Sequence, residues 1–256
     1  MVSLSNQLVE PIEIKRLMNN KKLHRYLQEL RYIIPTLYFN FHYLPWRQAI
    51  KLPVVLYKPH LLACKGKVLI EPEDGRIRHG MIRMGFRRVS IYPNNGITWD
   101  NHGGTVIFKG NCILGNDSYV SFGPKTTVDI GNEFRNYAGL KLVSYHRITF
   151  HHHVVLGWGC LCMDTNFHSL YDMEANTYLP AYGPIEIGEY NWFGAGCKVM
   201  HSVTTPEHCT WGMGTIITRG CIKKPYCLMG GSPVQVLREK VMNTTKDSLH
   251  NIENHD

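Results

Sequence analysis

The second half of the chain repeats every six residues. Counting in sixes from Ile187 gives a mostly apolar column: Ile187, Phe193, Val199, Thr205, Trp211 and Ile217. Four places after each of these lies a column of smaller side chains: Asn191, Cys197, Val203, Cys209, Thr215 and Cys221. A strand repeats every two residues and an α-helix about every 3.6, so a period of six requires another geometry. A solenoid with short straight faces and a corner every six residues satisfies it.

The same period extends upstream in a second frame. Its first column is Ile130, Leu142, Ile148, Val154 and Cys160, and its companion column is Val128, Leu140, His146, His152 and Trp158. We expect both columns to face inward. An interruption from about Met163 to Pro184 separates the two frames. Glycines follow the column residues at several predicted corners, where a residue without a Cβ is favoured: Gly131, Gly188, Gly194 and Gly212. A β-sandwich is the conventional alternative, but its turn signals come about every 8–12 residues, so the spacing favours the solenoid.

The composition restricts the setting of such a solenoid. The chain has 256 residues and a net charge of +8, which favours anionic partners. Its first residues include polar and acidic groups, so we expect no export signal, and no early stretch reaches the roughly 20 apolar residues of a membrane span. The eight cysteines then indicate a reducing compartment, where thiols behave as small apolar side chains. We therefore expect a cytoplasmic protein without disulfides.

Three stretches carry a resemblance to a known family. They read IGEYNWFGAGCKVM at 187–200, WGMGTIITRG at 211–220 and GGSPVQVLREK at 230–240. Together they resemble the hexapeptide-repeat acyltransferases, which are left-handed parallel β-helix enzymes, and above all the sugar O-acetyltransferases of bacterial polysaccharide biosynthesis. The resemblance covers about Val106 to Lys240. It departs at residues 231–234, which read Gly-Ser-Pro-Val where the family usually has Gly-Asn-Pro-Ala.

The resemblance implies an activity and an assembly. The expected reaction is direct transfer of an acetyl group from acetyl-coenzyme A to a sugar hydroxyl. The family also implies a homotrimer, with sites formed between neighbouring subunits. A small-molecule or glycan acceptor is therefore the expected partner, and the sequence does not name the sugar.

One histidine is the candidate general base. Acyl transfer to a hydroxyl needs a group that takes the hydroxyl proton, and the unperturbed pKa of histidine lies close to cytoplasmic pH. His168, in DTNFHSLYD at the start of the interruption, matches the family's catalytic histidine by resemblance. Asp164 and Asn166 in the same motif are candidates to orient its ring or to contact the acceptor. Both are also good turn residues, and that interpretation stays equally open.

The resemblance also assigns residues to the coenzyme. Trp192 matches the family's tryptophan beside the pantetheine arm, and Gly194 matches the glycine that follows it. The segment that lines the coenzyme groove in the family corresponds here to Gly212, Met213, Thr218 and Arg219. Bare backbone N–H groups and a cation suit an extended phosphopantetheine chain, and Arg219 is the cation expected to meet phosphate. Packing at the edge of a coil is the alternative role of Trp192.

Residues 150–168 also contain side chains of the kinds that bind zinc. His151, His152 and His153 are consecutive, and Cys160 and Cys162 follow them. Neighbouring residues of a strand point to opposite faces, whereas zinc takes four tetrahedral ligands, so we expect no metal. An acyl-enzyme on either cysteine is disfavoured because both occupy packing positions.

Three alternative functions remain open at this stage. The same base also suits N-acetylation of an amino sugar. A zinc enzyme similar to the γ-type carbonic anhydrases shares the β-helix fold, and a non-catalytic solenoid scaffold is the third alternative. Nucleic-acid binding is disfavoured, because the basic charge comes without a recognised binding motif.

The ends of the chain complete the predicted organisation. Residues 1–100 form an expected N-terminal helical and irregular cap, residues 101–232 the β-helix with a loop insertion at about 163–184, and residues 233–256 a C-terminal helix and polar tail. The N-terminal region is rich in aromatic and basic residues. We favour a capping role for it, because every solenoid must cover its open end, and peripheral contact with a membrane surface is the alternative.

Overall fold

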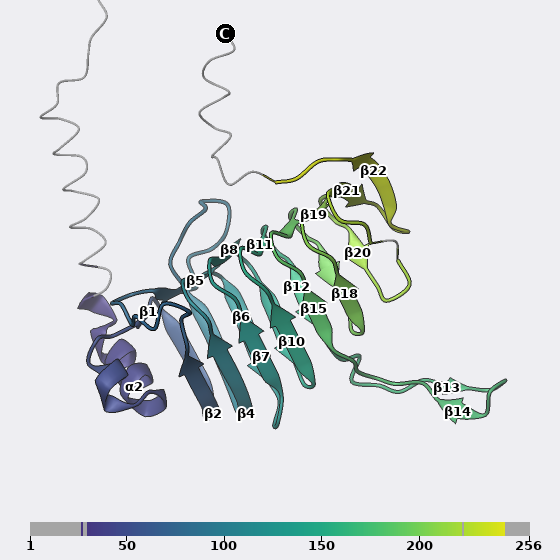
Figure 1. The fold of residues 1–256 in the computed structure, drawn as a ribbon. Coiled ribbons are helices and arrows are strands. Elements are labelled where there is room, and N and C mark those ends of the chain that lie inside the picture. The colour runs from purple at the N-terminus through teal and green to yellow at the C-terminus, as the bar shows by residue number, and fades with distance from the viewer. Residues whose placement is uncertain (1–26, 28–29, 222, 244–256) are drawn as a thin grey trace, which may run out of the picture.

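The chain folds into a three-faced prism of parallel strands. A computed structural model describes residue 27, residues 30–221 and residues 223–243. In it the strands wind around one axis, with the first coils beside helix α2 and the last at β21 and β22 (Figure 1). The predicted left-handed parallel β-helix is confirmed. The helices expected before residue 27 and the polar tail at 244–256 lie outside the described residues.

Each face of the prism is a ladder of short strands. The first face contains β1 (Val54–Leu56), β3 (Ile82–Met84), β5 (Cys112–Asn116), β8 (Phe134–Ala138), β11 (Val155–Leu156), β16 (Trp192–Phe193), β19 (Cys209–Trp211), β21 (Cys227–Gly230) and β22 (Gln235–Glu239). The second face contains β6 (Ser118–Phe122), β9 (Lys141–Ser144), β12 (Leu161–Met163), β17 (Lys198–Val199) and β20 (Ile216–Ile217). The third face contains β7 (Thr127–Ile130), β10 (Arg147–Phe150), β15 (Ile185–Ile187) and β18 (Val203–Thr205).

Two long strands join the second face to the third. They are β2 (Pro59–Ile70) and β4 (Ile97–Phe108), which pair with each other in parallel. The first half of β4 pairs with β6 and the second half with β7, so the strand turns the corner in between. The corner falls at Gly103 and Gly104, and their N–H groups donate to the side-chain oxygen of Asn101.

The six-residue columns of the second half are confirmed. Every member of the column from Ile187 to Ile217 is at most 3% exposed, and the small-residue column is buried from Asn191 to Thr215. Cys221, the last member, is half-buried. The chain spacing explains the regularity, because Ile185 pairs with Val203, eighteen residues or three hexads further on.

The upstream frame is only half correct. Its column from Ile130 to Cys160 is buried, but in the companion column only Val128 and Leu140 are buried. The others were predicted to face inward, yet His152 is half-buried, His146 is exposed and Trp158 is 38% exposed. The reason is that the second buried column lies two residues after the first and not two before it. Ile148 pairs with Ile185 and Phe150 with Ile187, so Phe150 takes the place of the downstream column that begins at Ile187. Leu156 and Cys162, six and twelve residues further on, are buried with it.

Close approach of successive coils explains why glycine recurs at the corners. A Cβ on Gly131 would lie 2.3 Å from the carbonyl oxygen of His151 in the next coil. A Cβ on Gly194 would lie 2.7 Å from the backbone nitrogen of Met213. Both contacts are shorter than any real Cβ makes, so the ladder spacing itself requires glycine here.

Two predicted boundaries are wrong. The coils begin at β1 and not near residue 101, because the strands of residues 54–100 already pair in register with the coils above. The helix expected at residues 233–243 is instead strand β22, which pairs antiparallel with β21. Residues 231–234 turn the chain back there, beginning at Gly231 with a φ of 94°, so the last described segment adds a strand to the first face.

The insertion leaves the prism between β12 and β15. It carries a small hairpin of β13 (Tyr171–Asp172) and β14 (Thr177–Tyr178), which extends away from the coils (Figure 1).

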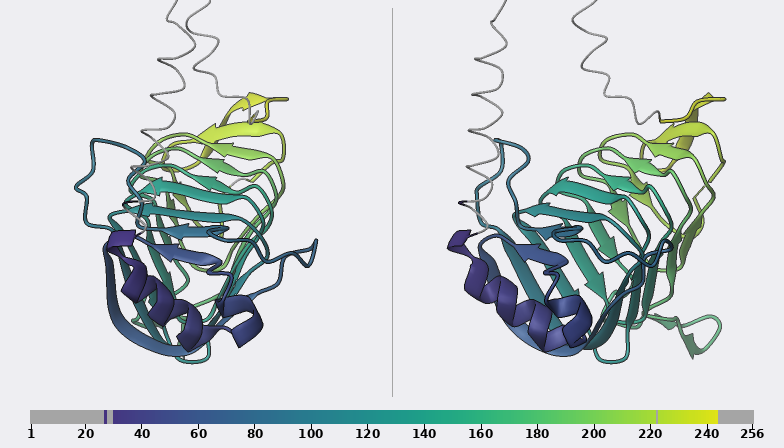
Figure 2. Two further views of the ribbon diagram at one scale, coloured as in Figure 1. Left: turned by 90° about the vertical axis from the view of Figure 1, so that its left-hand side faces the viewer. Right: turned by 60° about the vertical axis from the view of Figure 1, so that its left-hand side comes forward.

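Helices α2 (Ile33–Tyr43) and α3 (Trp46–Ala49) cover the first coil (Figure 2). The Phe39 ring packs edge-on against Trp99, and the Asn40 amide bonds to the carbonyl oxygen of Val54 at 2.7 Å. The expected capping role is therefore seen in the described part of the N-terminal region. No helix among the described residues is long and apolar enough to cross a membrane.

Candidate active site

The first leg of the insertion presents His168. Thr165 pairs with Tyr182 on the returning leg, and the Asn166 N–H donates to the Ala181 oxygen at 2.7 Å. Phe167 has a left-handed φ of 59°, and its ring packs edge-on against Tyr145 of the coil below. This anchored turn exposes His168 at the base of the hairpin. Among the described residues neither ring nitrogen of His168 has a hydrogen-bond partner.

The Asp164 side chain is hydrogen-bonded to the coil. Its carboxylate is fully buried and accepts hydrogen bonds from the Ser144 hydroxyl and from the backbone N–H groups of Tyr145 and His146, at 2.7 to 2.9 Å. Those groups belong to the turn one coil below. Asp164 therefore holds the start of the insertion to the prism, and its expected role beside His168 is not what this chain shows.

Asn166 contacts a different histidine. Its side-chain amide lies 3.0 Å from Nε2 of His201, and the Ser202 hydroxyl lies 3.1 Å from Nδ1 of the same ring. His201 follows β17, one coil above the insertion. The six-residue pattern did not single out this histidine, because it lies outside both columns at a coil corner.

Four residues expected at the coenzyme site line one cavity. Trp192, Gly194, Gly212 and Met213 border a cavity of about 600 Å³, which we name the tryptophan cavity. It lies where the first-face strands β11, β16 and β19 end. Trp158 also lines it, so two partly exposed indole rings face one space.

The N-terminal coils also contribute to the lining of this cavity. Arg88 and Val89 line the tryptophan cavity from the loop of residues 85–96 that joins β3 to β4. Tyr92 of this loop reaches the glycine corners, with its ring close to Gly139 and Gly159. Arg88 is the charged residue of the lining. Sequence reasoning missed Arg88 and Trp158, because one lies outside the repeat and the other was assigned to the core.

Thr218 and Arg219 lie outside this cavity. They follow β20 on the second face, at the corner that also holds His201 and the start of the insertion. The Arg219 backbone oxygen accepts a hydrogen bond from the Lys223 ammonium at 2.7 Å. Within one chain, the coenzyme residues predicted from the sequence are therefore divided between two corners, and Thr218 and Arg219 remain predictions of the sequence.

A second cavity lies on the third face next to the returning leg of the insertion. It measures about 560 Å³, and we name it the polar cavity for its lining: Lys109, Asp129, His146, Arg147, Thr149, His151, Pro184, Ile185 and Glu186. His146 also packs against Tyr182, which pairs with Thr165 near His168. Asp129 lies 3.8 Å from both Lys109 and Arg147. The cavity therefore offers donors and acceptors together.

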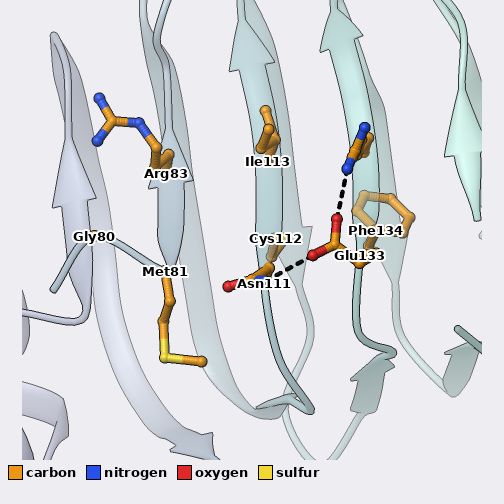
Figure 3. A pocket seen from close by; sticks show the side chains of 9 residues that line it. Gly80, Met81, Arg83, Asn111, Cys112, Ile113, Glu133 and Phe134 are labelled. Carbon is orange, nitrogen blue, oxygen red and sulfur yellow. Dashed lines mark hydrogen bonds and ion pairs between the residues drawn. The ribbon is translucent and has the colours of Figure 1, made fainter. Parts of the chain in front are cut away.

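A smaller cavity of about 220 Å³ lies on the first face among β3, β5 and β8 (Figure 3). Its carboxylate, Glu133, is bonded by Asn111 and Arg135, each at 2.6 Å. Burial acts to raise the pKa of Glu133, but these hydrogen bonds outweigh it and lower the pKa. The group is an ion-paired part of the wall and not a free acid or base.

The three consecutive histidines have three separate partners. His151 contacts Glu186 at 3.1 Å, His152 accepts a hydrogen bond from the Asn132 N–H at 3.1 Å, and His153 stacks on Tyr190. Across the described residues, no three histidine, cysteine, aspartate or glutamate side chains lie together as metal ligands would.

The neighbouring thiols are packing groups. Hydrogen bonding with Cys197 and burial raise the pKa of Cys160, and burial raises the pKa of Cys162 to about 12. A thiolate at either position is therefore disfavoured at neutral pH.

Comparison with known proteins finds acetyltransferases. A Staphylococcus aureus (strain COL) protein named "Putative acetyltransferase SACOL2570" is 34% identical over 74 residues, which are 29% of this chain and 34% of that protein. A chloramphenicol acetyltransferase of Agrobacterium fabrum is 30% identical over 70 residues, 27% of this chain and 32% of that protein. This chain thus matches about a third of the length of these curated relatives. No protein-family model matches the chain.

The fold has a solved counterpart. The crystal structure of the polySia specific acetyltransferase NeuO superposes with a TM-score of 0.51 at 14% identity, over 78% of this chain and 94% of that one. These comparisons confirm the predicted resemblance to hexapeptide-repeat acetyltransferases.

Proposed function

We propose that the chain transfers an acetyl group from acetyl-coenzyme A to a hydroxyl of a sugar. The observation that carries this proposal is the tryptophan cavity. Four residues that the sequence assigned to the coenzyme border one space, although 21 positions separate the first from the last. Its volume falls in the range of small-molecule sites, about 300–1,000 Å³.

The lining of the tryptophan cavity suits the two parts of coenzyme A. Trp158 and Trp192 supply flat apolar surface for the pantetheine arm. The glycine corners leave backbone N–H groups accessible beside it. Arg88 supplies a guanidinium, the group best matched to a phosphate oxygen pair. We assign Arg88, in addition to the Arg219 predicted from the sequence, as a phosphate contact of the donor.

His168 acts as the general base in this proposal. Its imidazole takes the proton of the acceptor hydroxyl as the hydroxyl oxygen attacks the thioester carbonyl carbon. The carbon–sulfur bond then breaks, the ester stays on the acceptor, and the leaving thiolate takes up the proton to give coenzyme A. His168 suits this role because its ring is exposed and uncommitted, whereas His201 is held at both nitrogens.

The separation of the two corners supports a shared site. The tryptophan cavity follows the first-face strands, whereas His168 follows the second face on the insertion. In Figure 1 the loop before β4 and the β13–β14 hairpin project from opposite sides of the prism. A homotrimer would place the hairpin of one subunit beside the cavity of the next, and this is the assembly we propose.

The polar cavity is the proposed acceptor site. Its lining combines carboxylates, imidazoles and cations, which can accept from and donate to the hydroxyls of a sugar. Tyr182 connects its edge to the leg that carries His168. We propose a surface-polysaccharide unit as acceptor. The free cysteines of the described residues suit a reducing cytoplasm as the compartment.

Calorimetry with coenzyme A tests the donor site. The full chain should bind coenzyme A, and Arg88→Gln should weaken binding about tenfold while leaving the affinity for pantetheine, which has no phosphate, unchanged. Arg78→Gln is the matched control, because Arg78 is an exposed arginine paired with Asp74. Absence of coenzyme A binding to the unaltered chain would refute the proposed function.

A further inference from the structure

Helix α2 is buried along one face and carries an exposed apolar stripe on the opposite face. The inward face contains Thr36, Phe39 and Asn40, all buried against the first coil. The outward stripe contains large apolar side chains that are all exposed, at positions i, i+3, i+4 and i+7: Ile34, Leu37, Tyr38 and Phe41. This spacing places them in one row on the helix surface. Capping the β-helix therefore explains only one face of α2.

The outward stripe continues onto α3. The Phe41 ring contacts the Trp46 ring with centroids 5.2 Å apart, and Trp46 is 69% exposed. Ile50, the C-cap residue that follows α3, is exposed one turn after Trp46. We name this surface the cap patch: Ile34, Leu37, Tyr38, Phe41, Trp46 and Ile50. It lies across the end of the prism, where Figure 2 shows α2 and α3 in front of the first coil.

The cap patch has a cationic border. Residues 30–70 contain no aspartate or glutamate but contain six lysines and arginines. Five of these six are exposed: Arg31, Arg47, Lys51, Lys65 and Lys67. Arg47 directly follows Trp46, and Lys51 directly follows Ile50, so charge and apolar surface alternate along α3.

We propose that the cap patch docks on an anionic lipid surface. Apolar and aromatic side chains flanked by lysine and arginine are the combination that inserts at the boundary between headgroups and acyl chains. Each cation near an anionic bilayer adds to the attraction. Binding in this orientation leaves the two larger cavities open, because none of their lining residues belongs to the cap patch.

The charges favour lipid over a second copy of this chain. A symmetric dimer through the cap patch would bring two sets of five exposed cations together. No carboxylate within residues 30–70 is present to pair with them. Like charges facing across an apolar contact oppose association, whereas lipid phosphates neutralise them.

Vesicle flotation of the full chain tests the proposal. The chain should bind vesicles of phosphatidylglycerol mixed with phosphatidylcholine at least about tenfold better than pure phosphatidylcholine. Raising the salt from about 0.05 to about 0.5 M should weaken this binding strongly, because exposed charges are then screened. Binding independent of lipid charge would overturn the proposal, and so would the absence of binding to either vesicle.

A matched pair of double variants locates the contact. Trp46→Ser with Arg47→Gln should lower binding to anionic vesicles about tenfold or more. Leu237→Ser with Arg238→Gln should leave it unchanged, since this pair is also exposed and adjacent but lies on β22 at the other end of the prism. Equal binding by both variants would exclude the cap patch. Loss of an oligomer by the first variant, measured by sedimentation, would show that a second copy is the occupant instead.

The result is independent of the proposed acetyl transfer. Neither Trp46 nor Arg47 lines a cavity of the candidate site, so the first variant should keep its turnover with a soluble acceptor. Failure of the lipid-binding proposal can therefore be distinguished from failure of the proposed acetyl transfer.

Discussion

The side-chain amide of Asn166 lies 3.0 Å from Nε2 of His201. Because the Ser202 hydroxyl lies beside Nδ1 of the same ring, both nitrogens of His201 are engaged within the coil corner. His168, two residues beyond Asn166, is exposed at the base of the hairpin. Of these two nearby histidines, only His168 therefore has a ring nitrogen available to accept the proton of an acceptor hydroxyl.

This difference predicts distinct effects of removing each ring. His168→Ala should lower kcat about 10²- to 10⁴-fold, the usual contribution of a general base. His201→Ala should lower it less than about tenfold, because that ring only positions the corner. Steady-state kinetics on both variants checks the assignment, and the opposite ranking would transfer the role of base to His201.

Asp164 should matter for stability. Asp164→Ala leaves one hydroxyl and two backbone N–H groups of the turn at residues 144–146 without their acceptor. We expect a loss of about 3 kcal/mol or more in the free energy of unfolding, measured by urea denaturation. Glu174→Ala, an exposed position on the hairpin, is the control and should change it by less than about 0.5 kcal/mol.

The coil spacing predicts a contrast between two glycines. Gly194→Ala places a Cβ 2.7 Å from the Met213 nitrogen and should destabilise the chain by about 2 kcal/mol. Gly220→Ala meets nothing within 4 Å and should be nearly neutral. Thermal unfolding of the two variants measures the difference, and equal midpoints would contradict the close approach of the coils.

Trp158 should contribute to donor binding, although the hexad pattern placed it in the core. Trp158→Ala should raise the KM for acetyl-coenzyme A about tenfold with little change in kcat, because the indole contacts the pantetheine arm before and during transfer alike. Trp46→Ala lies in the cap patch and should leave this KM unaltered. A fall in stability without a change in KM would show that Trp158 is a packing residue.

Glu133 gives a pH-dependent prediction. Its folded pKa is lowered, so its stabilising effect is present above the unfolded pKa of about 4.3 and is lost as the pH falls through the folded value. Glu133→Gln should therefore lower the free energy of unfolding near pH 7. The loss should be no more than about 1 kcal/mol, because water screens the pair. The difference should fade below about pH 4. A constant difference across this range would exclude the ion pair as its cause.

The six-residue period predicted the prism well where the coils are three hexads long. The six-residue column from Ile187 to Ile217 is buried as expected, because eighteen residues close one turn in register. In the upstream coils the second buried column lies two residues after the first and not two before it, so Trp158 lines a cavity instead of the core. Strand β22 was predicted as a helix because its alternation is too short to distinguish the two periods.

The sequence predicted many of the residues of the candidate site but not how they are arranged in space. Local sequence placed His168 on the insertion and the glycine corners beside Trp192. It could not place Arg88, because a loop of the first coils meets the later coils only after folding. Nor could it show that Asp164 bonds backward to the coil below, since that contact spans about one coil of chain.

Thiol release from acetyl-coenzyme A tests whether His168 is the general base of an acceptor-dependent transfer. The unaltered chain, mixed with acetyl-coenzyme A and sugar acceptors, should release coenzyme A at a rate that depends on the acceptor. His168→Ala should bind coenzyme A as tightly and release it at no more than about a hundredth of that rate. An undiminished rate of release by His168→Ala would contradict the role of His168 as the base. A rate that does not depend on the acceptor would contradict acetyl transfer to a sugar.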